Sequence, residues 1–234
     1  MSIKDNIDHI TGLKNEAAAR SGRKGEDVLL IAVTKLHTPG EINQAIDAGI
    51  TDIGENKVQE ILNKYDSVKP VRWHLIGHLQ TNKVKYIIDK VDLIHSVDSY
   101  RLAEEIEKRA TAVDKIMDIL VQVNAADEES KFGVSSSEAD ELIEQIRANC
   151  PHIRIKGLMC IAPFFDDPED ARPVFEAVKR IYDRYAYIRE DNLDFEYLSM
   201  GMSQDFEVAI EEGANCIRVG TAIFGNRDYR SEER

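Results

Sequence analysis

Two hydrophobic periodicities alternate along the chain and divide it into regular units. The residues VLLIAVT (28–34) form a continuous apolar run, which is typical of a strand buried on both faces of a parallel sheet. Before this run, residues 3–21 carry apolar side chains at helical spacing, and Gly22 follows them. The same alternation continues to the end of the chain and predicts eight strands separated by helices.

The other predicted strands share a short apolar core between two helical segments. They cover residues 51–54, 71–77, 93–97, 117–123, 155–161, 195–200 and 215–220, and the helices cover 39–48, 57–65, 81–89, 99–113, 136–149, 168–189 and 204–212, with a last helical stretch from Ala222. Strict alternation predicts an α/β protein with a parallel sheet. Eight units without an antiparallel interruption predict closure into a (β/α)₈ barrel with an extra N-terminal helix. Because no linker is visible, residues 1–234 are expected to form a single barrel domain.

Composition and charge narrow the classes of partner. The chain has 234 residues and a formal net charge of −13, so nucleic acid and an anionic membrane surface are disfavoured as partners. No apolar stretch approaches the length of a membrane span, and the N-terminus lacks the apolar core of a signal peptide. Three cysteines without a CxxC pair are typical of reduced, buried thiols in a cytoplasmic protein. With no oligomerisation signal, we expect a monomer.

Lys35 is the most suggestive candidate for chemistry. Ligand sites of such barrels lie at the carboxyl ends of the strands, and Lys35 ends the most apolar strand of this chain. Desolvation there would favour the neutral amine that Schiff-base formation needs. The alternative is an ordinary lysine that marks the strand end and extends into water.

The loops after strands 7 and 8 are the usual phosphate site of this fold. Gly201 and Gly220 would let the backbone approach an anion, Ser203 is placed as a helix N-cap, and Thr221 adds a hydroxyl. The alternative is that Ser203 only caps a helix and Gly220 only makes a turn. Both loops together predict an anion-binding rim.

Arg218 is expected to point into the barrel, opposite the apolar residues on either side of it. A buried arginine needs a partner, and a barrel carboxylate such as Glu196 is the ordinary one. His74 and His78 lie about 13 Å apart if they share a strand, too far to bind one metal ion. No metal ligand is predicted.

Several stretches of the sequence resemble motifs of a known family and occur in the same order as in that family. They are AVTKLHTPGEI (32–42), GENKVQE (54–60), WHLIGHLQTNKVK (73–85), HSVDS (95–99), VNAADEESKFGV (123–134), GLMCIAP (157–163), LSMGMSQDFEVAI (198–210) and IRVGTAIFG (217–225). They cover nearly the whole chain. On these motifs the chain resembles the YggS/PROSC family of pyridoxal phosphate homeostasis proteins, which share their barrel with the N-terminal domain of alanine racemase.

The resemblance implies a cofactor, pyridoxal 5′-phosphate (PLP), and a role for each matching residue. Lys35 would form a Schiff base with its aldehyde, Arg218 would face the pyridine nitrogen, and Asn56 and His78 would lie along the ring. Lys131 matches a lysine suggested as a secondary cofactor contact in some relatives.

The phosphate side of the site follows in the same way. The resemblance implies that Ser203, Gly220 and Thr221 hold the phosphate, with Met200 and Gly201 lining that side. No catalytic residue is implied.

The implied function is to bind PLP and to buffer, carry or deliver it to PLP-dependent apo-enzymes. Related racemases add a β-domain with a catalytic tyrosine, and the sequence leaves no segment for one after strand 8. An arginine opposite the ring nitrogen would also weaken the cofactor as an electron sink. The alternatives are a racemase or related PLP enzyme, and an aldolase-like barrel whose lysine attacks a sugar phosphate without a cofactor.

Overall fold

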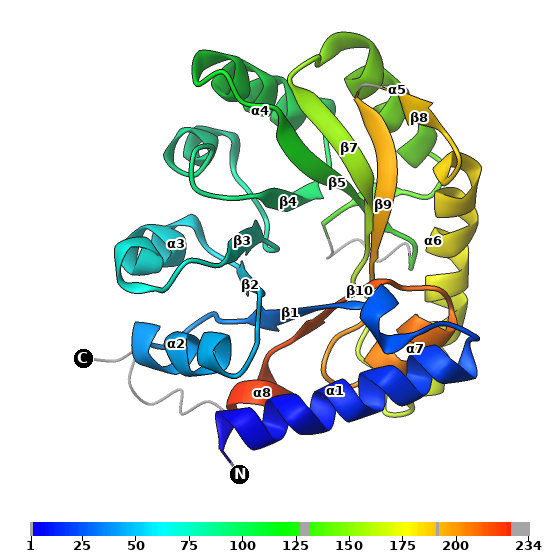
Figure 1. Ribbon diagram of the computed structural model, residues 1–234. Helices are drawn as coiled ribbons and strands as arrows, with labels where there is room; N and C mark the ends of the chain where they lie inside the picture. The colour runs from blue at the N-terminus through cyan, green and yellow to red at the C-terminus, as the bar shows by residue number, and fades with distance from the viewer. Residues whose placement is uncertain (1, 127–131, 191, 226–234) are drawn as a thin grey trace.

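The computed structural model describes residues 2–126, 132–190 and 192–225, and within them the main feature is a closed barrel (Figure 1). Its eight parallel strands are β1 (Leu29–Val33), β2 (Asp52–Glu55), β3 (Arg72–Leu75), β4 (Leu93–Val97), β5 (Met117–Asn124), β7 (Ile153–Met159), β9 (Leu193–Ser199) and β10 (Cys216–Val219). The ring closes through β10, because Cys216 pairs with Leu29 of β1 and with Ser199 of β9. The predicted (β/α)₈ barrel is confirmed.

Helices surround the strands on the outside (Figure 1). They are α1 (Ile3–Arg20), α2 (Pro39–Asp47), α3 (Val58–Lys64), α4 (Tyr100–Ala112), α5 (Ala139–Asn149), α6 (Arg172–Tyr185), α7 (Phe206–Glu211) and α8 (Thr221–Phe224), with 3₁₀ turns at Gly25–Asp27, Tyr65–Ser67, Thr81–Tyr86 and Pro168–Ala171. The buried side of each long helix is apolar, as Leu102 and Ile106 of α4 illustrate. In the described part of the chain, no helix has the length and apolar character that crossing a membrane requires.

The structure differs from the predicted elements at several places. Of residues 81–89, predicted as a helix, Thr81–Tyr86 form a 3₁₀ segment. A short strand that was not predicted, β6 (Val134–Ser135), pairs parallel with β5 outside the ring. The segment 168–189 splits because Pro168 and Pro173 each occupy a first helical turn, where a missing N–H group is tolerated. Past α6, the short strand β8 (Arg189–Glu190) pairs antiparallel with β9 outside the ring. The expectation of no antiparallel pairing was therefore wrong, although closure is unaffected.

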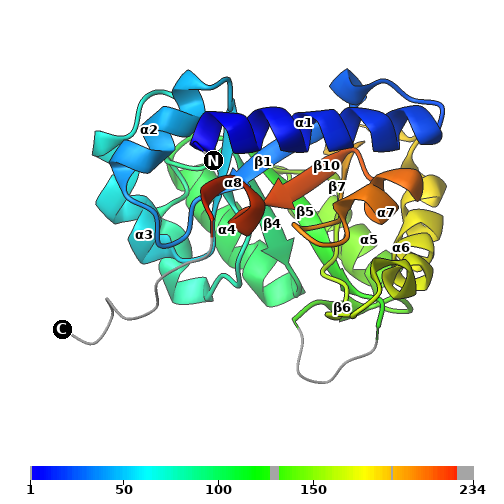
Figure 2. The same cartoon turned by 90° about the horizontal axis from the view of Figure 1, so that it is seen from below.

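The extra N-terminal helix α1 lies along the outer surface, beside α7 and α8 (Figure 2). Its first turn has a capping box between Ser2 and Asp5. Near its end, Arg20 pairs with Glu207 and Glu211 of α7. Helix α1 therefore stabilises α7 and α8, the helices that follow the last two barrel strands.

The barrel interior combines an apolar layer with polar side chains. Leu93, Leu120 and Met159 form a small buried cluster separate from the main core. His95 lies two positions after Leu93 on β4 and so shares its face of the strand. Polar groups inside the barrel need partners, and these partners define the site described below.

Candidate functional site

A cavity of about 640 Å³ opens where the barrel strands end at their carboxyl termini. Lys35, Ser203, Arg218, Gly220 and Thr221 line it, so the structure brings these five predicted residues together. The rest of the lining is largely apolar and includes Pro163, Phe164 and Phe165, which follow β7. An amine, a cation and a rim of small residues thus face one space.

Lys35 lies two residues after the end of β1 and is half-buried. The residue before it, Thr34, is fully buried, and the residue after it, Leu36, has a left-handed backbone with φ of 66°. This conformation is unfavourable for a branched side chain. The backbone around Lys35 is therefore held in a specific shape.

The turn after β9 forms one part of the rim. Gly201 has φ of 90°, and a Cβ atom there would lie 2.7 Å from the Cα of Phe206 and from the Cβ of Ala209, so only glycine fits without displacement. Asp205, not Ser203, is the N-cap residue of α7, because residues 203–205 form a turn before the helix starts. The predicted N-cap role of Ser203 was wrong, although its place on the cavity wall stands.

The start of α8 forms the other part of the rim. Gly220 is the N-cap residue, and its carbonyl accepts hydrogen bonds from Ile223 and Phe224 at 2.9 and 3.0 Å. The first N–H groups of a helix have no acceptor within it. Thr221 and Ala222, the first two residues of α8, line the cavity, and N–H groups at such a position can bind an anion.

Arg218 projects from β10 into the barrel and is 3% exposed. Its guanidinium donates to Ser199 Oγ at 2.5 Å and to the carbonyl of Cys160 at 2.8 Å. Glu196, the carboxylate named as the ordinary alternative partner of Arg218, pairs instead with Lys156 at 2.6 Å. Burial lowers the pKa of Arg218 from its ordinary value, but an arginine keeps its charge at neutral pH.

A buried series of hydrogen bonds extends from Arg218 through the barrel. Ser199 Oγ lies 3.1 Å from His95 Nδ1, and His95 Nε2 lies 3.0 Å from His74 Nδ1. His74 Nε2 in turn lies 2.8 Å from Asp52 Oδ1. We call Ser199, His95, His74 and Asp52 the interior relay. It links the arginine of the cavity to a carboxylate at the start of β2.

Burial holds the pKa of His95 well below its usual value, and its electrostatic interactions with His74 and Arg218 act in the same direction. Burial also acts to raise the pKa of Asp52, but the hydrogen bonds from His74 and Thr51 outweigh it and keep this pKa below the ordinary value. The relay therefore ends in a charged Asp52 and passes through a neutral His95 at neutral pH.

The remaining predicted residues do not line this cavity. Asn56 and His78 line a neighbouring space of about 500 Å³, where the His78 ring stacks on Phe132 at 3.9 Å. Met200 and Gly201 are buried behind the rim. Lys131 lies outside the described residues.

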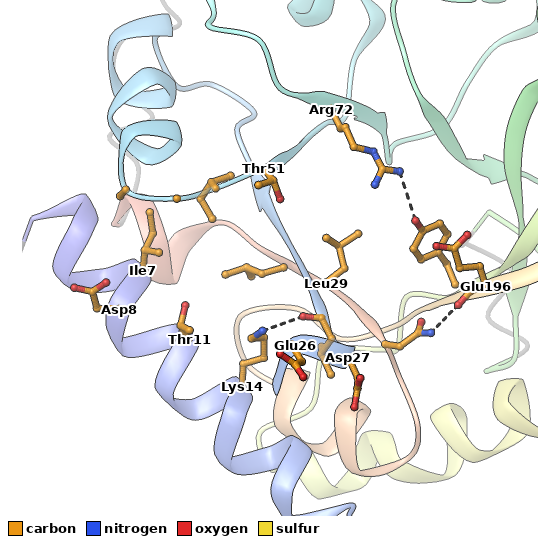
Figure 3. A pocket seen from close by; sticks show the side chains of 17 residues that line it. Ile7, Asp8, Thr11, Lys14, Glu26, Asp27, Leu29, Thr51, Arg72 and Glu196 are labelled. Carbon is orange, nitrogen blue, oxygen red and sulfur yellow. Dashed lines mark hydrogen bonds between the residues drawn. The ribbon is translucent and has the colours of Figure 1, made fainter. Parts of the chain in front are cut away.

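Another cavity, of about 660 Å³, lies at the opposite end of the barrel, against α1 (Figure 3). Its ionisable lining includes four carboxylates, Asp8, Glu26, Asp27 and Glu196, against two cations, Lys14 and Arg72. The Lys14 ammonium donates to the carbonyls of Gly25 and Val28 at 2.6 and 3.0 Å. This acidic cavity does not suit a phosphorylated aldehyde, whereas the cavity at Lys35 does.

Sequence reasoning missed Asp205, Gln204 and the two phenylalanines Phe164 and Phe165, all of which line the cavity at Lys35. Asp205 is 9% exposed, and its Oδ1 accepts a hydrogen bond from the amide of Met202 at 2.6 Å. Its place three residues after Met202 in a strand-end turn was the available signal. The phenylalanines follow β7, another strand end, and no pattern marked them as ligand contacts.

Comparison with known proteins gives consistent matches. The family model described as alanine racemase, N-terminal domain, matches residues 13–228. The pyridoxal phosphate homeostasis protein of Aquifex aeolicus is 42% identical over 231 residues, which cover 98% of this chain and 100% of that protein. The protein of the same name from Escherichia coli K12 is 37% identical over 97% of each chain.

A solved structure extends these matches to a bound ligand in a relative. PipY of Synechococcus elongatus PCC7942, solved with PLP bound, is 31% identical. Its TM-score is 0.77, and the match covers 91% of this chain and 100% of that one.

Proposed function

Because the chain belongs to the alanine racemase N-terminal domain family, and within it to the pyridoxal phosphate homeostasis proteins, we propose that it holds PLP on Lys35 and serves cellular vitamin B6 homeostasis. In this role it buffers or carries the cofactor for PLP-dependent apo-enzymes. The proposal places it in the cytoplasm, as a monomer whose single barrel domain contains the whole site.

The observation that carries the proposal is the shared cavity of Lys35, Arg218 and the rim at Gly220 and Thr221. These groups fit the three parts of PLP. The Lys35 amine suits the aldehyde, the first turn of α8 and the Ser203 hydroxyl suit the phosphate, and the apolar wall suits the ring. Asn56 and His78, from the neighbouring space, are assigned to the ring side as the resemblance implies.

When bound, PLP supplies an electron-withdrawing ring whose strength depends on a proton at the pyridine nitrogen. The charge of Arg218 would affect how readily that nitrogen binds a proton. Its charge is held inside the barrel by Ser199 and Cys160, neither of which is a carboxylate. A fixed positive charge facing the nitrogen disfavours a second one there. The arrangement therefore suits reversible binding better than carbanion chemistry.

The exposure of the cavity supports the same reading. Phe164 on the cavity wall is 74% exposed, so among the described residues the cavity at Lys35 is open to water. Access of water disfavours turnover of amino acids. We therefore propose a binding protein without racemase turnover.

The test compares transfer with turnover. Protein loaded with PLP is mixed with a PLP-dependent apo-enzyme, and recovery of that enzyme's activity is followed. In parallel, hydrogen–deuterium exchange at the α-carbon is measured for a panel of amino acids. The proposal expects transfer with little exchange. Robust exchange without transfer would instead favour a racemase or related enzyme.

A further inference from the structure

Three side chains that touch no part of the cavity hold the backbone on both sides of Lys35. They are Glu55 at the end of β2, and Glu60 and Lys64 on α3. We call these three residues the lysine clamp. The reason to examine them is Leu36, whose left-handed backbone would revert to an ordinary conformation unless something held it.

Two contacts hold Thr34, the residue before Lys35. Lys64 Nζ donates to the carbonyl of Thr34 at 2.9 Å, and the Thr34 hydroxyl donates to Glu55 Oε1 at 2.7 Å. Lys64 Nζ also lies 2.8 Å from Glu55 Oε1, so both contacts end on one ion pair.

Glu60 holds Leu36, the residue after Lys35. The amide of Leu36 donates to Glu60 Oε2 at 2.6 Å, and the same oxygen lies 2.8 Å from Lys64 Nζ. Glu60 therefore stabilises the left-handed conformation directly, with a charge-assisted hydrogen bond to the strained residue.

Burial makes these contacts strong and directional. Glu55 is fully buried and Lys64 is 8% exposed. Burial raises the pKa of Glu55. Burial acts in the same direction on Glu60, but the Leu36 amide and the Lys64 ammonium outweigh it and hold the pKa of Glu60 below its ordinary value. A buried ion network of this kind tends to specify one geometry rather than to add stability.

We propose that Glu55, Glu60 and Lys64 are positioning residues that aim the Lys35 amine into the cavity by fixing the backbone at Thr34 and Leu36. This inference rests on the proposed function and adds to it the residues that govern the covalent step. The clamp contacts no residue of the phosphate rim in the described structure, so it acts on the bond to the aldehyde and leaves phosphate binding alone.

The test separates the two parts of binding in the full-length protein. Glu60→Gln keeps the size of the side chain but weakens its contact with the Leu36 amide and the Lys64 ammonium. Affinity is measured for PLP and for deoxypyridoxine phosphate, an analogue with a methyl group in place of the aldehyde. We expect Glu60→Gln to weaken PLP binding and slow its condensation about tenfold, the scale of a left-handed backbone cost, with the analogue's affinity unchanged.

A second substitution that restores condensation in Glu60→Gln gives an independent readout. Asparagine tolerates the left-handed conformation better than leucine, and Leu36 is 43% exposed, so a change there leaves the core intact. Adding Leu36→Asn to Glu60→Gln should recover a large part of the lost condensation rate. The matched control is Glu105→Gln, which breaks a similar pair with Arg109 on α4 and should alter neither ligand's binding.

The outcomes are distinct. If the unmodified protein fails to condense with PLP on Lys35, the proposed function fails. If it condenses and Glu60→Gln matches it, the clamp proposal is wrong. Equal losses for PLP and the analogue, without rescue by Leu36→Asn, would mean that Glu60 only supports the fold and would also overturn the proposal.

Discussion

His74 and His95 share a hydrogen bond at the centre of the barrel, with 3.0 Å between Nδ1 of His74 and Nε2 of His95. Both rings are fully buried. Because Asp52 accepts from His74 Nε2, that nitrogen carries a proton. If both rings are neutral, His95 must then donate through Nε2 and accept from Ser199 through Nδ1. The relay is thereby directed from Arg218 toward Asp52.

This direction predicts the protonated nitrogen of each ring. In cofactor-free protein at neutral pH, nitrogen NMR of the imidazoles should show both His74 and His95 protonated at Nε2 only. Signals for Nδ1–H at either ring would reverse the donors and contradict the account. Because the measurement needs no cofactor, it tests the relay independently of function.

The low pKa of His95 predicts a loss of stability in mild acid. In the unfolded chain this histidine binds a proton below about pH 6.5, whereas burial prevents protonation in the folded protein. The unfolded state thus binds more protons as pH falls through that range, and the free energy of unfolding decreases.

A variant isolates this contribution from the other titrating groups. His95→Gln keeps a donor toward His74 but has no proton to gain. The difference in urea-unfolding free energy between the unmodified protein and His95→Gln should shrink from pH 7.5 to pH 5.5. A gap that stays constant or widens would contradict the buried, neutral His95.

The sequence predicted the barrel well because its determinants are local. The continuous apolar run of β1 and the alternation around Arg218 both report burial directly. The splitting of residues 168–189 was predictable in principle from Pro168 and Pro173. Strand β8 was not, since two exposed residues, Arg189 and Glu190, carry no periodicity.

Lys35→Ala should remove the covalent link and leave weaker binding through the phosphate rim. The rim groups at Ser203, Gly220 and Thr221 do not depend on the amine, so affinity for the aldehyde-free analogue should be nearly unchanged. Equilibrium dialysis with PLP and with the analogue measures both parts. Complete loss of both ligands would show that the rim alone does not bind phosphate.

Gly201→Ala should damage the rim and the fold together. Its φ of 90° and the 2.7 Å approach to Phe206 and Ala209 combine strain with a clash, for a cost of roughly 2–4 kcal/mol in unfolding free energy. Gly22→Ala is the matched control, because φ there is 73° but a Cβ would meet nothing within 4 Å. It should cost only about 1 kcal/mol, and chemical denaturation compares the two. Equal costs would contradict the close approach at Gly201.

Within the site, the sequence predicted where residues lie when their place along a strand decides it. Lys35 and Arg218 both line the cavity as expected, and their roles toward the cofactor stay predictions. The sequence did not predict partners chosen in three dimensions: Glu196 seemed a reasonable partner for Arg218, but it lies beside Lys156 on the neighbouring strand. The pair Glu60–Lys64 has the spacing of an ordinary surface ion pair, and only the fold reveals that it holds the backbone at Leu36.

The central claim is that one amine, that of Lys35, binds the cofactor aldehyde. The most direct measurement incubates the protein with PLP, reduces it with borohydride and maps the adduct by peptide mass spectrometry. The account predicts one modified peptide carrying the adduct on Lys35, and none in Lys35→Ala. An adduct mainly on another lysine, or no adduct at all, would contradict it.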